Sequence, residues 1–246
     1  MPDPHTAHSL HKFRFLPLLF LLFAILACQA TTSPTPTTLG STSDETKIVY
    51  PTGIETRHLN NGVIAVLDHK GHYGMGFSDK WKVGAFDKSF IPVVQKYSQT
   101  NQAIQSLFDQ IYLKDPSLRI FAIDTSPEHL TKDSMAVLHI GTHDDAVYRN
   151  ATLDDLVAEY TAYLNKGSKG TISVTQAILG KSNYGIPFVI LTTKSTPQNS
   201  EPVYGASVLI QTNTTYIEML YTTFDPAINI VDELSPILLT FGTFVE

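Results

Sequence analysis

Cysteine is almost absent from this chain of 246 residues. The one example, Cys28, stands at the end of an apolar run near the N-terminus. With a single thiol, the chain cannot form an internal disulfide, and sites built from several thiolates, such as Cys₄ zinc sites and iron–sulfur clusters, are excluded. Residues 29–246 contain no thiol, so cysteine nucleophiles are excluded from them as well.

Long apolar runs and basic clusters are missing too. The longest apolar run, residues 15–27, has 13 residues, whereas a membrane-spanning helix needs about 20. Asp and Glu (23) outnumber Lys and Arg (17), which gives a formal net charge of −6. Nucleic acid is therefore not an expected partner, and neither is an anionic lipid surface recognised by charge alone.

The N-terminus has the layout of a bacterial export signal. Lys12 and Arg14 precede the apolar run, and Ile25-Leu26-Ala27-Cys28 resembles a lipobox, in which the chain is cut before the cysteine. The sequence predicts that residues 1–27 are a signal peptide and that Cys28 carries the lipid. The expected location is the bacterial cell envelope, facing outside the cytoplasm, in the outer membrane if there is one.

Composition divides the remaining chain into two parts. Residues 28–46 are rich in Ser, Thr and Pro with Leu39 as the only large apolar residue after the anchor, so they are predicted to be a disordered spacer. Residues 47–246 have the length and composition of a single globular domain.

Short β-branched and aromatic runs bounded by Gly, Asn, Asp or Pro predict strands. These runs cover residues 62–67, 74–78, 81–86, 118–124, 135–141, 171–180, 184–195, 203–211 and 216–222. Asp79 and Lys80 form a tight turn between the second and third runs, which predicts a hairpin. The short loops between the later strands require antiparallel neighbours, because a parallel crossover needs a dozen or more residues.

Apolar residues at helical spacing predict a helix over residues 100–113. A second helix is expected to begin at Thr152, which forms a capping box with Asp155, and to end at Gly167. A third is expected to begin at Asp225 and to bury a stripe formed by Ile230, Leu234, Leu238 and Phe241. The predicted fold class is α+β, a mainly antiparallel sheet with helices packed on it.

Two segments carry a resemblance to a known family. The stretch Gly76-Phe77-Ser78-Asp79-Lys80-Trp81-Lys82-Val83 is similar to the opening of PsbP-like domains, the α/β/α sandwiches that include the DcrB and LpqN lipoproteins. The strand at 216–221 followed by a helix closing on Phe241 is similar to their ending. The resemblance implies a binding, scaffolding or assembly module at a membrane, with no shared catalytic residues.

Histidine pairs are the best candidates for metal chemistry in the sequence. His139 and His143 are four residues apart, with Asp144 and Asp145 beside them. On a helix this spacing would suit zinc, but Gly141 and the apolar surroundings of His139 favour a strand, where the two side chains lie about 13 Å apart. His69 and His72 form a weaker pair that a solvated turn also explains. No metal site or cofactor is predicted.

Nucleophile and phosphate-binding motifs are incomplete. The segment at Gly205-Ala-Ser207 lacks the second glycine of a nucleophile elbow, and no Walker spacing occurs. The leading hypothesis is a lipid-anchored, non-enzymatic module that binds an envelope protein or a small ligand. The alternative is an envelope enzyme, metal-dependent or a serine hydrolase, that uses His139, His143 and the nearby aspartates.

The anchoring hypothesis predicts that Cys28 is lipidated. Growth with a labelled lipid precursor should label the wild-type protein, and Cys28→Ser should abolish the label and stall or release the precursor, because the thiol is the acylated atom. Unlabelled wild type whose mature N-terminus lies elsewhere would contradict the hypothesis.

Overall fold

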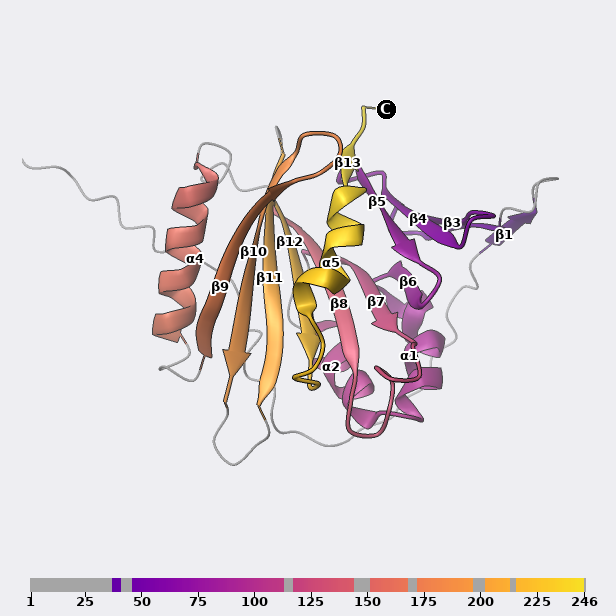
Figure 1. The fold of residues 1–246 in the computed structure, drawn as a ribbon. Helices are drawn as coiled ribbons and strands as arrows, with labels where there is room; N and C mark the ends of the chain where they lie inside the picture. The colour runs from indigo at the N-terminus through magenta and orange to yellow at the C-terminus, as the bar shows by residue number, and fades with distance from the viewer. Residues whose placement is uncertain are drawn as a thin grey trace, which may run out of the picture.

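Two antiparallel β-sheets and several helices make up the fold (Figure 1). The computed structural model describes residues 37–40, 46–112, 117–143, 151–167, 172–196, 202–212 and 216–245. Every strand pairing within the two sheets is antiparallel. The predicted α+β class is confirmed, with two sheets in place of the one expected.

The first sheet has the strand order β1-β2-β3-β4-β5-β13. Its strands are β1 (Thr37–Gly40), β2 (Thr46–Val49), β3 (Ile54–His58), β4 (Val63–Asp68), β5 (Tyr73–Ser78) and β13 (Gly242–Thr243). Alternate residues of β4 and β5 are buried, as expected for a sheet with one face on the core. The polar strands β2 and β3 were not predicted from the sequence.

Strand β1 lies inside the predicted spacer. It pairs with β2 from Thr37 opposite Val49 to Gly40 opposite Thr46. The prediction of disorder is wrong for these four residues, because the open edge of β2 offers backbone partners to a threonine-rich segment with strand propensity. The rest of residues 28–45, including Cys28, lies outside the described residues.

The second sheet has the order β6-β7-β8-β12-β11-β10-β9. Its strands match the predicted ones closely: β6 (Trp81–Ala85), β7 (Leu118–Asp124), β8 (Ala136–His143), β9 (Ile172–Lys181), β10 (Pro187–Ser195), β11 (Val203–Gln211) and β12 (Tyr216–Thr223). The apolar runs were reliable signals because most of these strands are buried on both faces.

The predicted hairpin of residues 74–86 is wrong. Both strands exist, but β5 pairs with β4 and β6 pairs with β7, so the turn at Asp79 and Lys80 carries the chain from one sheet to the other. Phe77 and Trp81 lie edge to face across this turn, with ring centroids 6.1 Å apart. Each strand buries large side chains between the sheets, which a flat hairpin could not do.

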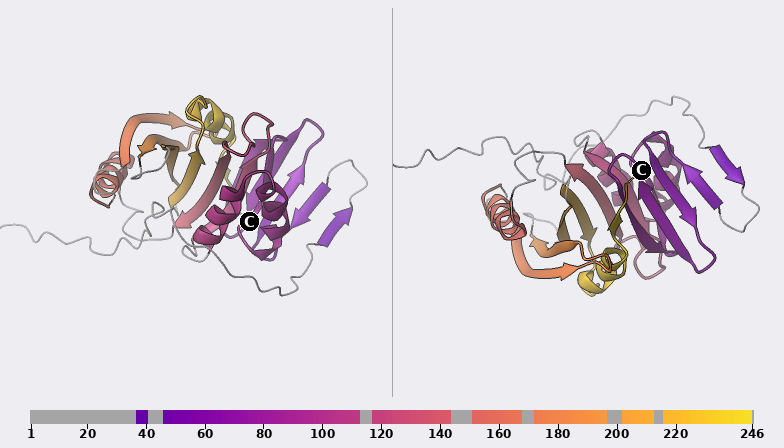
Figure 2. Two further views of the ribbon diagram at one scale, coloured as in Figure 1. Left: turned by 90° about the horizontal axis from the view of Figure 1, so that it is seen from below. Right: turned by 90° about the horizontal axis from the view of Figure 1, so that it is seen from above.

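Helices cover the outer face of the second sheet and close its inner face (Figures 1 and 2). Beside the short 3₁₀ turn η1 (Lys88–Phe90), they are α1 (Ile91–Ser98), α2 (Gln102–Tyr112), α4 (Leu153–Gly167) and α5 (Ile230–Leu239). One apolar cluster lies under α1 and α2, and another lies under α4. The largest cluster joins both sheets to α5.

The predicted start of one helix is confirmed, and that of another is wrong. At α4, Thr152 and Asp155 exchange the reciprocal hydrogen bonds of a capping box, as predicted. Helix α5 begins at Ile230 and not at Asp225, because the Asp225 carboxylate accepts from the backbone of Ala227 and closes a turn there. Residues 225–229 are therefore a loop.

A buried ion pair joins the two sheets. Arg119 of β7 binds both carboxylate oxygens of Asp68 at the end of β4, with Nη2 2.7 Å from Oδ1. The backbone N–H groups of Lys70 and Gly71 also donate to Asp68, and Arg119 donates to the carbonyl of Thr52. Asp68 is fully buried, so its charge depends on these donors.

We therefore expect Arg119→Met to destabilise the chain by about 3–5 kcal/mol, because it leaves a buried carboxylate without its countercharge. Arg57→Met is the matched control. Arg57 is 41% exposed and pairs with Glu55, and its loss should cost about 1 kcal/mol or less. Urea unfolding of the full chain measures both, and equal losses would contradict this role for the pair.

Candidate functional site

His139 is a core residue. It lies in β8 with no exposed surface, and its ring stacks on Phe121 with centroids 6.4 Å apart. Burial lowers the pKa of His139 to about 3, so the ring is neutral at physiological pH. Neither ring nitrogen has a hydrogen-bond partner among the residues that the structure describes.

His143 lies four residues further along the same strand, whose backbone is continuous from Ala136 to His143. This extended backbone separates the two histidines by about 13 Å, so β8 does not form the metal site that the spacing offered. The side chain of His143, together with Asp144 and Asp145, lies outside the described residues.

His69 and His72 both pack edge-on against Phe244, with ring centroids 5.8 and 6.3 Å from that ring. The Nε2 atom of His69 also lies 3.1 Å from a carboxylate oxygen of Glu55. The two histidines therefore connect the turn at residues 68–72 to Glu55 and Phe244.

A different polar cluster joins three distant segments: the turn between the sheets, the end of β7 and the first turn of α5. Asp124, fully buried at the end of β7, accepts a hydrogen bond from the Ser126 backbone and lies 2.8 Å from His129 Nδ1. The ammonium group of Lys80 lies 3.2 Å from the same carboxylate and also contacts Glu233.

The charged groups of this cluster stabilise one another in their ionised forms. Burial would raise the pKa of Asp124, but the hydrogen bonds from His129 and Ser126 and the charge of Lys80 hold it below its usual value. Desolvation would lower the pKa of Lys80, but Glu233 and Asp124 raise it above its usual value. Both groups are therefore ionised across the physiological range.

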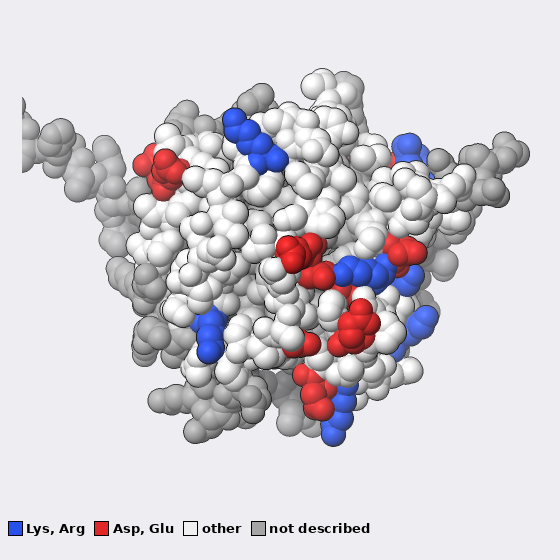
Figure 3. Space-filling model, viewed as in Figure 1, with Lys and Arg blue, Asp and Glu red and all other residues white. Residues whose placement is uncertain are grey.

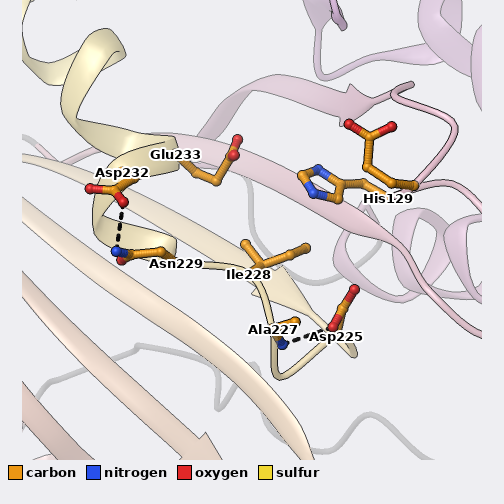
Figure 4. Close-up of a pocket in the computed structure, with 8 residues that line it drawn as sticks. His129, Asp225, Ala227, Ile228, Asn229, Asp232 and Glu233 are labelled. Atoms are coloured by element: carbon orange, nitrogen blue, oxygen red, sulfur yellow. Dashed lines mark hydrogen bonds between the residues drawn. The ribbon is translucent and has the colours of Figure 1, made fainter.

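A cleft of about 410 Å³ opens beside the cluster. Four carboxylates, one histidine and three uncharged residues line it: Glu128, Asp225, Asp232, Glu233, His129, Ala227, Ile228 and Asn229. Figure 3 shows acidic side chains gathered around the lower end of α5, and in Figure 4 the ring of His129 points toward the 225–229 loop. The cleft is strongly negative.

Three members of the cluster carry side chains that ligate metal ions in proteins. The ligand atoms of Asp124, His129 and Glu233 all lie within 4.8 Å of one another. However, the Lys80 ammonium already contacts both carboxylates, so a metal ion would have to displace a group that neutralises them. The cluster fits an internal ammonium group better than a metal ion.

Tyr221 of β12 lies edge to face with Trp81, with ring centroids 6.4 Å apart. It is 2% exposed, and its hydroxyl has no hydrogen-bond partner among the described residues. Burial raises the pKa of Tyr221, and the charges of Glu233, Asp124 and Asp225 raise it further. A buried hydroxyl without a partner costs free energy in the unliganded protein.

Sequence reasoning missed this site because its members are far apart. Lys80 and Glu233 are 153 positions apart in the sequence, and no local spacing connects them. The one local signal was Asp124-Thr125-Ser126, an Asx-type turn at the end of a buried strand, with His129 three residues later.

Comparisons with known proteins bear on the fold. No protein-family model and no curated protein matches the sequence. The chain is similar to the solution structure of cyanobacterial PsbP (CyanoP) from Synechocystis sp. PCC 6803, with 13% identity, 74% of this chain and 93% of that chain covered, and a TM-score of 0.45. It is also similar to PA94, a protein of unknown function from Pseudomonas aeruginosa, with 17% identity, coverage of 42% and 65%, and a TM-score of 0.34.

Both TM-scores lie below 0.5, so the site must be interpreted from its own residues. Within the described residues, the model contains no helix with the length and apolarity needed to span a membrane.

The contacts of Lys80 with Asp124 and Glu233 lead us to expect that Lys80→Met loses stability in a pH-dependent way. Because two carboxylates lose their countercharge, we expect the free energy of unfolding to fall by about 1–3 kcal/mol near pH 7. This loss lies between those typical of exposed and of buried ion pairs. Asp124 has a depressed pKa, so its contribution is present above the unfolded-state value of about 3.9 and is lost as pH falls below it.

The difference in the free energy of unfolding between wild type and Lys80→Met should therefore become smaller as the pH falls from 5 toward 2. Urea unfolding at several pH values measures it. Lys181→Met, at an exposed position of β9, is the control and should stay within about 0.5 kcal/mol of wild type at every pH. A difference that does not vary with pH would contradict the charge account.

Proposed function

We propose that this chain is a lipid-anchored bacterial envelope protein that works as a non-enzymatic binding or assembly module. In this proposal Cys28 carries the lipid and tethers the domain to the membrane, on the side away from the cytoplasm. The acidic cleft beside α5 is the surface that contacts a positively charged group of an envelope partner.

The observation that carries the proposal is the unbalanced charge of the cleft. Four carboxylates line it and Asp124 lies beneath it, whereas Lys80 is the one cation in contact with this cluster among the described residues. Concentrated charge of one sign in a concave surface attracts ligands of the opposite sign and speeds their association.

The lining favours binding over catalysis. Asp124 orients His129 as it would a general base, but no Ser, Thr, Lys or Tyr side chain is among the residues that line the cleft, so His129 has no side-chain nucleophile there to activate. The buried ring of His139 offers no support for the enzyme alternative either.

Site-specific crosslinking of the anchored, full chain in cells tests the proposal. A photoreactive phenylalanine analogue would replace Ala227, which is exposed and lines the cleft, or Ala177, an exposed residue of β9 that serves as the matched control. We expect an adduct from position 227 and none from position 177. The adduct should disappear when Asp225→Asn and Asp232→Asn are combined, because the attraction is electrostatic.

Two results would contradict the proposed role of the cleft. One is an adduct that forms equally from both positions or persists in the double variant. The other is the absence of any adduct from position 227.

A further inference from the structure

We infer that the outward face of the first sheet lies on the membrane and binds the headgroups of anionic phospholipids. This inference rests on the lipid anchor of the proposed function and concerns a surface separate from the acidic cleft. Three observations carry it: exposed cations stand beside apolar side chains on this face, the outer helices pack on the other sheet, and the chain that leads to Cys28 starts from the edge of this sheet.

The strand register shows which residues share the outward face. Lys47 of β2 lies opposite Arg57 of β3, and Arg57 lies opposite Ala65 of β4. Ala65 in turn lies opposite Gly76 of β5. Residues directly opposite one another in a sheet are on the same face, so these four positions form a row across the sheet. Their neighbours along the strands, such as Ile64, are buried in the core between the sheets.

The centre of the outward face is apolar and open. Its positions in β4 and β5 carry small or apolar residues that are all partly exposed: Val63, Ala65, Leu67, Gly74 and Gly76. Helices α1, α2 and α4 pack on the second sheet, and their apolar clusters include no described residue of β2 to β5. The end of α5 reaches the edge of the face, where the backbone N–H of Gly76 donates to Thr240.

Positive charge stands beside this apolar centre. Glu55 is the one carboxylate at an outward position of β2 to β5, and it is 3% exposed. It pairs with Lys47, Arg57 and His69. The side chains of Lys47 and Arg57 are 38% and 41% exposed, so two accessible cations share one buried carboxylate. The chain as a whole has a net charge of −6, but this face has the opposite sign.

The course of the chain brings the outward face to the bilayer. Strand β1 is the outermost strand of the first sheet (Figure 1), and its Thr37 pairs with Val49 of β2. Thr37 follows Cys28 by nine positions, and nine residues span at most about 30 Å when fully extended. A lipid on Cys28 therefore holds the edge of this sheet, and with it Lys47 and Arg57, close to the headgroups.

The anchor and the cations act together. One Lys or Arg near an anionic bilayer strengthens attachment about fivefold, so two strengthen it about thirtyfold. That is too little to recruit a free acidic protein, but it is enough to orient a domain that a lipid already tethers. A second copy of the chain is a poorer occupant, because it would bring a face of the same positive sign against this one.

Reconstitution of the full chain, processed in bacterial cells and purified, tests the inference. Ala65→Cys at the centre of the face, or Ala177→Cys on β9 as the matched control, carries an environment-sensitive fluorophore. Acylated Cys28 cannot react with it. The vesicles are phosphatidylcholine with phosphatidylglycerol, or phosphatidylcholine alone. We expect emission from position 65 to rise at least about twofold on the anionic vesicles, and emission from position 177 to stay unchanged.

Two further measurements isolate the charges. Lys47→Gln combined with Arg57→Gln should weaken docking about thirtyfold and remove the rise at position 65. Lys132→Gln combined with Lys181→Gln removes the same charge at exposed positions elsewhere and should leave the rise intact. Salt at about 0.5 M should abolish the rise in the otherwise unchanged chain, because it screens the attraction. The salt measurement does not depend on how a charge variant folds.

The remaining outcomes distinguish the inference from the proposed function. A chain that floats with the vesicles but shows no rise at position 65, an equal rise at both positions, or an equal rise on neutral vesicles would overturn the docking and leave the anchored module intact. A rise that needs no vesicles and grows with protein concentration would overturn it in favour of a second copy. A chain that floats with no vesicle would overturn the proposed anchor and the docking together.

Discussion

The site depends on the ion pairs that the ammonium group of Lys80 forms with Asp124 and Glu233. Lys80 stands in the turn where the chain leaves the first sheet for the second, and it contacts Asp124 at the end of β7 and Glu233 in α5. These contacts hold together three segments that meet nowhere in the sequence. They also neutralise the buried carboxylate, so that Asp124 can remain charged and orient His129.

Packing of α5 explains where the cleft lies. Helix α5 buries Leu234 and Leu238 in the core shared by the two sheets, while its first turn presents Asp232 and Glu233 outward. Two carboxylates at a helix N-terminus are favoured by the helix dipole, so the fold tolerates this local charge. The loop that ends at Asn229 completes the wall and adds Asp225 and Ile228.

The sequence predicted the strands better than their arrangement. Apolar runs such as residues 118–124 and 203–211 matched β7 and β11, because strands buried on both faces have no polar alternation to obscure them. The pairing of β5 was missed because a two-residue turn favours a hairpin locally, and only the burial of Phe77 and Trp81 sends the chain to the second sheet. The site was out of reach, because long-range contacts such as that between Lys80 and Glu233 leave no local pattern.

The central claim is that the protein meets its partner through the acidic cleft. Hydrogen–deuterium exchange of the full chain, with and without the polyamine spermidine at saturating concentration, tests this claim most directly. The account predicts slower exchange confined to residues 124–130 and 224–233, because a bound cation holds the two walls of the cleft together. Protection elsewhere, for example along β9 or β2, or no protection at all, would contradict it.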